Sequence, residues 1–302
     1  GNYHMAEQGI ADSREEALTY LASLSHDRMR SELVEAYIDN GPTMVKWFED
    51  NTEVAFEIVE DFPDYHPENP GANRTGGRSL ECPLFPFAEL GEWEHRISQS
   101  RQMSPHLLMN ETTLGRGAIT GAPREIVQQR AEENLRGCGQ ALIGRLLKSC
   151  LDRDIVIEID YQAEELIINN GVVQGVKFNT PLGVKEITAQ NVIIATGGFE
   201  WNKEMVNSFV RGPLQRPVSI ETNTGDGLKM AMRAGAALGN MQEAWWVPVI
   251  DITDNNGSEI PWMVNRERTN PRCIMVNKNG KRFTNEAANY NALGAAFPQL
   301  DA

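Results

Sequence analysis

The sequence "NVIIATGGF" (residues 191–199) is a solid apolar run that ends in two glycines before a phenylalanine. Such a run is typical of a strand buried in a parallel sheet, because both faces of that strand are covered. Glycine then lets the backbone approach a ligand closely and adopt a positive φ angle. Ligands of open α/β sheets bind beyond the carboxyl ends of strands, which here means Ala195, Thr196, Gly197 and Gly198. On its own, the stretch fits a ligand site and an ordinary strand-to-helix turn equally well.

A second glycine turn lies in "TNTGDGLKMAMRAGAAL" (residues 222–238), where Gly225, Asp226 and Gly227 precede a predicted helix over 225–237. Backbone N–H groups at the start of a helix attract anions and polar ligand atoms. A carboxylate at this place can accept a hydrogen bond from a ribityl-type hydroxyl. The alternative is that Asp226 only caps the helix, which is the commoner role for such an aspartate.

Strands are predicted on the amino-terminal side of the first turn. The segments with a two-residue period or strong β-propensity are 155–159, 165–179 and 184–196, and Asn170-Gly171 is a strong signal for a two-residue hairpin turn. The pattern therefore changes from helices to strands near residue 155.

The first half of the chain is predicted to be mainly helical. Ser13 and Glu16 form a capping-box pattern before an amphipathic helix. Further helices are expected over Arg30–Ile38, from Pro42 onward, and over Arg124–Asp152, the last broken near Gly137 and Gly139. The intervening segment 61–120 has no periodicity but many aromatic residues, which favours an ordered, functional loop over disorder.

Composition excludes several classes of protein. The 302 residues carry 28 basic and 42 acidic side chains, a net charge of −14, with no basic cluster for a nucleic-acid phosphate backbone. No apolar run is long enough for a transmembrane helix, and the five histidines are too dispersed to predict a metal site. Four widely spaced cysteines are typical of reduced thiols in a cytoplasmic protein.

Taken together, the motifs resemble the FAD-dependent family of fumarate reductase and succinate dehydrogenase flavoproteins, and most of all its 3-ketosteroid Δ1-dehydrogenase branch. The similarity runs in order over nearly the whole chain. A glycine-rich stretch at 137–144 has the wrong spacing for a dinucleotide fingerprint and is not used. The matching stretches are "FPDYHPENPGA" with "GRSLEC" (62–82), "GQALIGRLL" (139–147), "VIIATGGFEWN" (192–202), "NTGDGLKMAMRAGAALGNMQEAWWVP" (223–248) and "IMVNKNGKRFTNEAANY" (274–290).

The resemblance implies an α/β fold, with a Rossmann-like FAD-binding domain and an inserted α+β catalytic or cap domain. The first domain would span 1–243 and lack its first βαβ unit, and the second would begin at 244 and continue through 302. The family's amino-terminal G-x-G-x-x-G turn and its carboxyl-terminal segment have no match, so we expect the central part of a longer flavoprotein. By resemblance, the FAD would meet the backbone around Ala163, the turn at 195–198 and the side chain of Asp226.

The resemblance also implies a catalytic role for Tyr290. In the fumarate reductases, an arginine four places beyond the "NE" pair delivers a proton, whereas the ketosteroid dehydrogenases have a tyrosine there that removes a proton beside the ketone. The chain also has "AWWVP" where the dicarboxylate enzymes have a histidine, and Trp245 and Trp246 suit a flat apolar substrate. Core packing is the alternative for these tryptophans. Asn289 departs from the steroid branch, which often has proline there.

The resemblance therefore predicts an FAD-dependent oxidoreductase that dehydrogenates a small apolar ketone next to its carbonyl and passes electrons to an external acceptor. Two alternatives stay open. One is a fumarate reductase-like flavoenzyme for a non-steroid acid or ketone, and the other is a non-catalytic ligand-binding fragment. Composition and the dispersed histidines predict neither a metal site nor a nucleic-acid partner.

Overall fold

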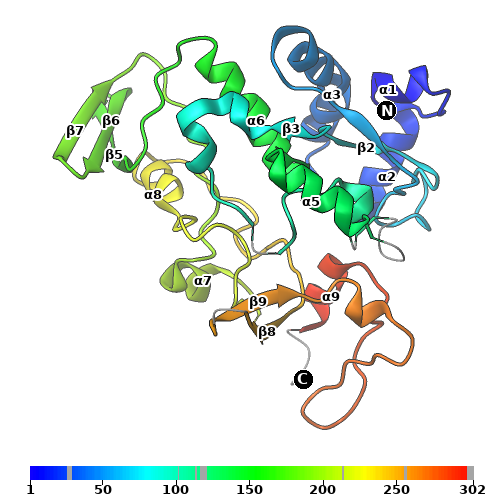
Figure 1. Cartoon of the computed structure of the whole chain (residues 1–302). Helices are drawn as coiled ribbons and strands as arrows, with labels where there is room; N and C mark the ends of the chain where they lie inside the picture. The colour runs from blue at the N-terminus through cyan, green and yellow to red at the C-terminus, as the bar shows by residue number, and fades with distance from the viewer. Residues whose placement is uncertain are drawn as a thin grey trace. The chain divides into compact units, whose positions relative to one another are not determined.

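The computed structural model describes residues 1–25, 29–100, 102–112, 114–115, 121–212, 214–254 and 257–297 (Figure 1). The chain divides into two units, Gly1–Ile155 and Val156–Ala302, which are described separately below. The predicted domain boundary between residues 243 and 244 falls inside the second unit and remains a prediction. None of the helices described is long and apolar enough to cross a membrane. All four cysteines are free thiols.

The first unit combines helices with short antiparallel strand pairs, β1 with β2 and β3 with β4. Its elements are α1 (Tyr3–Glu7), α2 (Arg14–Ser25), α3 (Ser31–Asn51), β1 (Glu57–Glu60), β2 (Gly76–Glu81), β3 (Phe85–Pro86), η1 (Phe87–His95), η2 (Met109–Glu111), α5 (Arg124–Glu132), β4 (Leu135–Arg136) and α6 (Cys138–Leu151).

The helix starts follow from local chemistry. The Ser13 hydroxyl accepts a hydrogen bond from the Glu16 N–H at 3.1 Å, so the predicted cap of α2 is confirmed. The predicted helix over 124–152 does break, because Gly137 has an extended backbone and begins α6. The prediction of two helices around Pro42 was wrong, since α3 continues through that proline. A proline inside a helix removes one N–H···O bond, and the rest of this 21-residue helix retains its own.

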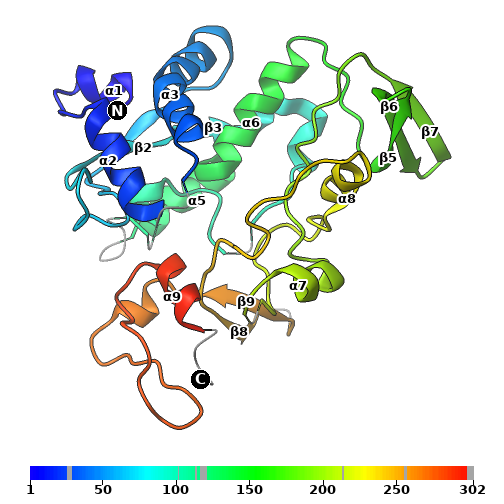
Figure 2. The same cartoon turned by 180° about the vertical axis from the view of Figure 1, so that it is seen from behind.

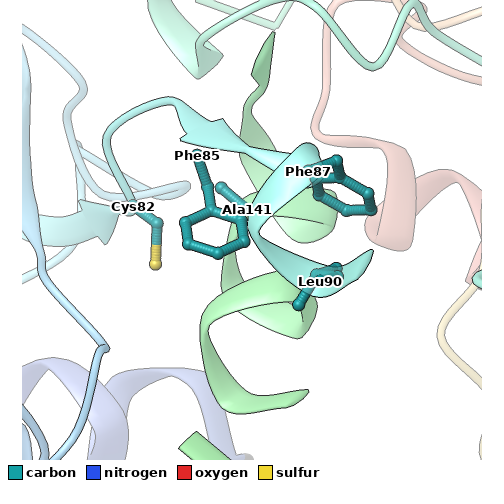
Figure 3. Close-up of a cluster of buried hydrophobic side chains, with 5 residues drawn as sticks. All are labelled: Cys82, Phe85, Phe87, Leu90 and Ala141. Atoms are coloured by element: carbon teal, nitrogen blue, oxygen red, sulfur yellow. The ribbon is translucent and has the colours of Figure 1, made fainter. Parts of the chain in front are cut away.

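The core of the first unit lies where α6 meets the segment around β3 and η1. Phe85, Phe87 and Ala141 are at most 2% exposed, and Figure 3 shows them gathered with Cys82 and Leu90. The rings of Phe85 and Phe87 meet edge to face at 6.0 Å between centroids, a favourable arrangement for aromatic pairs. The segment expected to be an ordered loop therefore supplies the core, with short strands and 3₁₀ turns of its own; residues 101, 113 and 116–120 lie outside the described residues.

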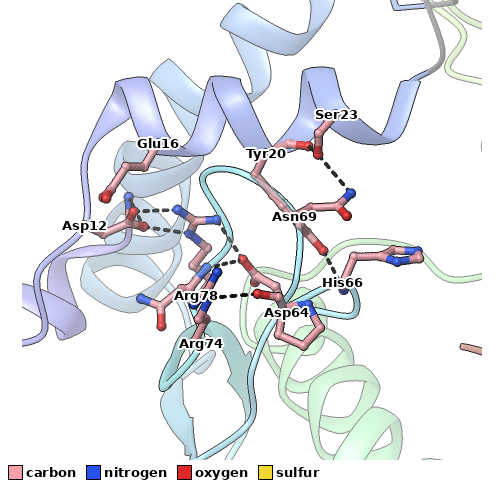
Figure 4. A network of polar contacts seen from close by, with 12 residues as sticks. Asp12, Glu16, Tyr20, Ser23, Asp64, His66, Asn69, Arg74 and Arg78 are labelled. Atoms are coloured by element: carbon pink, nitrogen blue, oxygen red, sulfur yellow. Dashed lines mark hydrogen bonds and ion pairs between the residues drawn. The ribbon is translucent and has the colours of Figure 1, made fainter. Parts of the chain in front are cut away.

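A buried ion-pair network ties α2 to this segment (Figure 4). The Arg78 guanidinium on β2 donates two hydrogen bonds to the Asp12 carboxylate, at 2.6 and 2.8 Å, and one to Asp64, at 2.7 Å. The Asp12 side chain is only 3% exposed. Burial raises the pKa of Asp12, but the hydrogen bonds and charges of Arg78 and of the amino-terminal ammonium of Gly1 together outweigh it and lower that pKa from 3.8 to about 2.

We predict that Arg78→Met lowers the free energy of unfolding by about 3 kcal/mol, because it removes the cation that the Asp12 and Asp64 carboxylates share and leaves Asp12 with only the amino-terminal ammonium, 3.0 Å away. Urea titration at neutral pH measures this loss. The contribution of Asp12 is complete above its ordinary pKa and is lost as the pH falls through about 2, so the difference between wild type and variant should narrow over that range. The control is Arg30→Met, which breaks an exposed pair with Glu32. Equal stability losses in the two variants would contradict the prediction.

The second unit contains a three-stranded antiparallel sheet, β5-β6-β7, and a separate β8-β9 hairpin. Seen from both sides, α8 lies against the end of this sheet (Figures 1 and 2), and α8 and β5 are in contact. Its elements are β5 (Gln162–Asn169), β6 (Val172–Thr180), β7 (Gly183–Thr188), α7 (Lys203–Phe209), α8 (Asp226–Arg233), β8 (Val249–Thr253), β9 (Glu259–Met263), η3 (Glu267–Thr269) and α9 (Tyr290–Ala296).

The hairpin prediction is confirmed, because Asn170 and Gly171 both have positive φ angles, 49° and 78°, and join β5 to β6. The predicted strand over 155–159 was wrong, and the one predicted over 184–196 is confirmed only as far as Thr188, where β7 ends, since residues 191–196 form no strand. A strand exists only through its neighbour, and no described segment pairs with either of them. Ile193 is accordingly 91% exposed. Every strand pairing in the described residues is antiparallel. The structure shows a fold that mixes helices and strands.

Candidate functional site

A polar pocket of about 340 Å³ opens between β5 and α8. Its walls are the start of β5 and one face of α8. The two elements are joined by a hydrogen bond from Arg233 on α8 to the Glu164 carbonyl at 3.2 Å. Carboxylate, amide and cationic groups thus converge on one cavity. Its lining residues are Gln162, Ala163, Glu164, Glu165, Asp226, Lys229 and Arg233.

Asp226 reaches across this pocket. Its Oδ2 accepts hydrogen bonds from Gln162 Nε2, at 3.2 Å, and from Thr224 Oγ1, at 3.1 Å. Lys229 Nζ lies 3.6 Å from its other oxygen. The N-cap of α8 is Gly225, which has no side chain for capping, so Asp226 is the first helical residue and not the cap. The capping explanation therefore fails, and the carboxylate is directed into the polar pocket.

The two glycine turns predicted as ligand loops lie against each other. The Gly225 N–H donates to the Gly198 carbonyl at 3.0 Å. Gly197 and Gly225 have positive φ angles of 73° and 78°. A Cβ at Gly197 would collide with the Asn223 side chain, and one at Gly227 would collide with Thr196, so this packing requires glycine at both positions. Residues 195–197 are exposed at the surface beside these contacts.

Glu200, just after the first glycine turn, connects that turn to the residues that precede the second. Its carboxylate accepts hydrogen bonds from Asn223 Nδ2, at 2.8 Å, and from the Ser219 hydroxyl. Burial raises the pKa of Glu200, but these hydrogen bonds outweigh it, and the pKa is lower than the ordinary value. Glu200 therefore stays ionised at neutral pH and holds residues 219–223 beside the first glycine turn.

An apolar cavity of about 450 Å³ begins at Gly198 and extends away from the glycine turns. Trp245 and Trp246 both line it. Trp245 is 77% exposed, which excludes core packing as the reason for that tryptophan. The other lining residues are Phe199, Glu200, Val210, Leu214, Gln215, Arg216, Pro217, Val218, Ser219, Glu243, Ala244, Val247 and Val249.

Tyr290 is the first residue of α9 and is half-buried. Asn289 begins this helix, and its side chain accepts a hydrogen bond from the Ala292 N–H at 2.9 Å. α9 packs directly on Trp246, whose backbone N–H donates to Asn291 Oδ1 at 2.9 Å. A Cβ at Gly294 would collide with the Trp246 side chain. Tyr290 does not itself line the apolar cavity, but its helix rests on a residue that does.

The structure thus brings together two groups of predicted residues. Ala163 shares the polar pocket with Asp226, and the turn at 195–198 lies against the turn at 223–227. Trp246 connects the apolar cavity to the helix of Tyr290. Three residues of the polar pocket were missed, Glu165, Lys229 and Arg233. Lys229 and Arg233 lie three and seven places after Asp226, so helical spacing alone would have placed them on its face.

The site thus combines a polar pocket beside Asp226 with an apolar cavity that includes Gly198 of the first glycine turn, an arrangement that suits a ligand with polar and apolar parts. The comparison with protein families agrees with this interpretation. The chain belongs to the FAD binding domain family, whose model matches residues 1–301. The prediction of FAD as cofactor is therefore confirmed by the family.

Relatives of known activity are similar to the chain over nearly its full length. A 4-oxocyclohexanecarboxylate 2-dehydrogenase of Sinomonas cyclohexanicum is 34% identical over 99% of this chain and 53% of its own. A 3-oxosteroid 1-dehydrogenase of Mycobacterium tuberculosis is 31% identical over 96% of this chain and 54% of its own. The chain thus spans about half the length of these curated relatives.

A solved structure shares the fold. The 3-ketosteroid Δ1-dehydrogenase of Sterolibacterium denitrificans, determined in complex with 1,4-androstadiene-3,17-dione, superposes with a TM-score of 0.84. It is 28% identical, and the match covers 96% of this chain and 56% of that one. The family resemblance drawn from the motifs is confirmed by these matches.

The residues present fit a flavin dinucleotide. The polar pocket is lined by acidic residues, one amide side chain, two cations and backbone groups, which suit the hydroxyls and ring nitrogens of a nucleotide. The two turns with positive φ have no side chains on their glycines, which permits close approach of a ligand. Among the described residues, no group of three or more His, Cys, Asp or Glu side chains is arranged to hold a metal ion.

Proposed function

We propose that this chain is part of an FAD-dependent oxidoreductase that introduces a double bond next to the carbonyl of a cyclic ketone. One observation supports this most directly: α9, which begins with Tyr290, packs on Trp246 of the apolar cavity, and that cavity starts at Gly198. A proton-transferring side chain, an apolar chamber and the cofactor turns thus form one continuous series of contacts.

In this proposal, the FAD domain is Rossmann-like, and the catalytic or cap domain begins at residue 244. Ala163, Asp226 and the turn from Ala195 to Gly198 hold the cofactor. When bound, FAD supplies the acceptor for the hydride from the carbon one place further from the carbonyl. The phenolate form of Tyr290 takes the proton from the carbon beside the carbonyl and becomes the phenol, and the two remaining electrons of that C–H bond form the double bond. An external acceptor then removes the electrons.

The substrate class follows from the cavity and from what the relatives act on. Two of these relatives are named for a 3-oxosteroid and for 4-oxocyclohexanecarboxylate, and both compounds contain a ketone in a six-membered ring. An apolar cavity of about 450 Å³ that is flanked by Trp245 and Trp246 suits a flat ring better than a dicarboxylate. We therefore propose a ring ketone as substrate.

Steady-state assays of the flavin-loaded protein that contains this chain test the proposal. The assays supply an artificial electron acceptor and compare a 3-oxosteroid, 4-oxocyclohexanecarboxylate and succinate. We expect turnover of at least one ring ketone and none of succinate. Turnover of succinate alone would replace the proposal with a fumarate reductase-like activity, and flavin-loaded protein without turnover of any of the three would favour a binding function.

A further prediction concerns Trp246. Trp246→Ala should raise the KM for a bulky apolar ketone more than the KM for a small acid, because the larger substrate buries more apolar surface against the indole. Lys185→Met, on the sheet of β5 to β7 and outside the lining of the apolar cavity, serves as the control and should leave both constants unchanged. Equal changes in both KM values would show that Trp246 only supports packing.

A further inference from the structure

The chain between β9 and α9, residues 264–289, has little regular structure to hold it. It contains the short helix η3 and one isolated bridge, between Val276 and Arg282, in the part of the chain that is described. Ordering a backbone costs about 1–2 kcal/mol per residue in conformational entropy. Side-chain contacts must therefore determine where this segment delivers Tyr290.

One such contact is the Glu286 carboxylate, which is buried. It accepts hydrogen bonds from the Met275 N–H at 2.7 Å and from Arg282 Nη2 at 2.5 Å, and its two oxygens share the single Nε–H of Arg282 at 3.1 Å each. The hydrogen bonds from Arg282 and then from Met275 lower the pKa of Glu286 from 4.5 to about 2. Glu286 is thus ionised at neutral pH and closes the turn from 275 to 286.

The second contact is Arg268, on η3. This side chain is 5% exposed, although it is a cation that cannot be deprotonated in practice. Its Nη1 donates hydrogen bonds to the carbonyls of Glu286 and Ala288, the latter at 2.6 Å. Its Nε is buried without a hydrogen-bond partner in the residues described. Burying a guanidinium with an unsatisfied N–H lowers the stability of the fold, which suggests that Arg268 serves a function other than stability.

Tyr290 lies two residues beyond Ala288, whose carbonyl Arg268 binds. Ala288 immediately precedes Asn289, which caps α9, and Tyr290 follows. On the other side, α9 is held by Trp246 through Asn291 and Gly294. The backbone before Tyr290 is thus held by the Arg268 guanidinium, and the helix after Tyr290 is held by its contact with Trp246.

We propose that Arg268 is a positioning residue that sets the place of the Tyr290 phenol by binding the carbonyls of Glu286 and Ala288. This inference rests on the proposed role of Tyr290. Arg268 acts through the backbone and does not need to touch substrate. A displacement of about 1 Å in a reacting group costs up to about 100-fold in rate, so loss of this contact acts on turnover more than on substrate binding.

The test compares three variants of the flavin-loaded protein. Arg268→Met keeps a side chain of similar length but leaves both carbonyls without their donor. Arg268→Lys retains a cation whose N–H groups can reach them in part. Lys281→Met removes an exposed cation from the same segment and is the matched control.

We expect Arg268→Met to lower kcat by about 10- to 100-fold with little change in KM. Arg268→Lys should recover part of the loss, and Lys281→Met should behave as wild type. Without substrate, hydrogen exchange at the amides of Met275 and Ala292 should speed up in Arg268→Met while the thermal midpoint changes little. Unchanged kcat, or a loss of kcat accompanied by an equal loss of flavin and global stability, would overturn the inference. Faster exchange together with full turnover in Tyr290→Phe would instead contradict the proposed function while leaving the contact itself established.

Discussion

Replacement of Tyr290 by phenylalanine should lower turnover by about 100- to 10,000-fold, the usual cost of removing one general acid or base. The variant keeps the ring and loses only the hydroxyl. The helix α9 should still form, because Asn289 caps it and Trp246 packs against it, and the substitution changes neither residue. Flavin content, measured by absorbance of the purified protein, should equal that of wild type.

Tyr37→Phe is the matched control, since that phenol is 72% exposed on α3 in the first unit. It should leave turnover and flavin content unchanged. Wild-type turnover in Tyr290→Phe would remove Tyr290 from the mechanism. A loss of flavin together with turnover would instead assign the tyrosine to cofactor binding.

The second large effect is expected for Asp226→Ala, in flavin affinity. Hydrogen bonds that involve a charged group contribute about 1.5–3 kcal/mol, so the Kd for FAD should rise by about 10- to 100-fold. The reason is that the carboxylate is directed into the polar pocket, where Gln162 Nε2 meets it at 3.2 Å, and does not cap its helix. Titration of the apoprotein with FAD, followed by fluorescence quenching, measures this change.

Glu204→Ala makes a matched comparison, because Glu204 also lies in the first turn of a helix, α7. Both changes remove a favourable charge near a helix amino terminus, which stabilises a helix by about 0.3–1 kcal/mol. Only Asp226→Ala should weaken FAD binding. Equal Kd values for the two variants would show that Asp226 serves α8 and not the cofactor.

Local chemistry made several features predictable from the sequence. The cap at Ser13 and the hairpin at Asn170-Gly171 depend on neighbouring residues only, and both form as expected. The glycine turns at 197–198 and 225–227 were likewise recognised from residue type, because few other residues adopt positive φ at low cost.

Features that depend on distant partners were not predictable. The apolar run 191–196 has the composition of a buried strand, but a strand also requires a neighbour, and none of the described segments pairs with it. The contact between Trp246 and α9 joins residues 45 apart, and Arg268 lies 18 residues before its first carbonyl. No spacing rule for one helix or strand reaches across such separations, so these contacts of the candidate site emerged only from the structure.

Anaerobic mixing of the flavin-loaded protein with a ring ketone tests whether the ketone is the electron donor to the flavin. We predict that the visible absorbance of the oxidised flavin disappears, and that mass spectrometry recovers a ketone that has lost two hydrogens, one from each of the two carbons nearest its carbonyl on one side. Tyr290→Phe should slow this bleaching without changing its final extent. A flavin that stays oxidised with every ring ketone, yet is reoxidised by fumarate after chemical reduction, would contradict the proposed function.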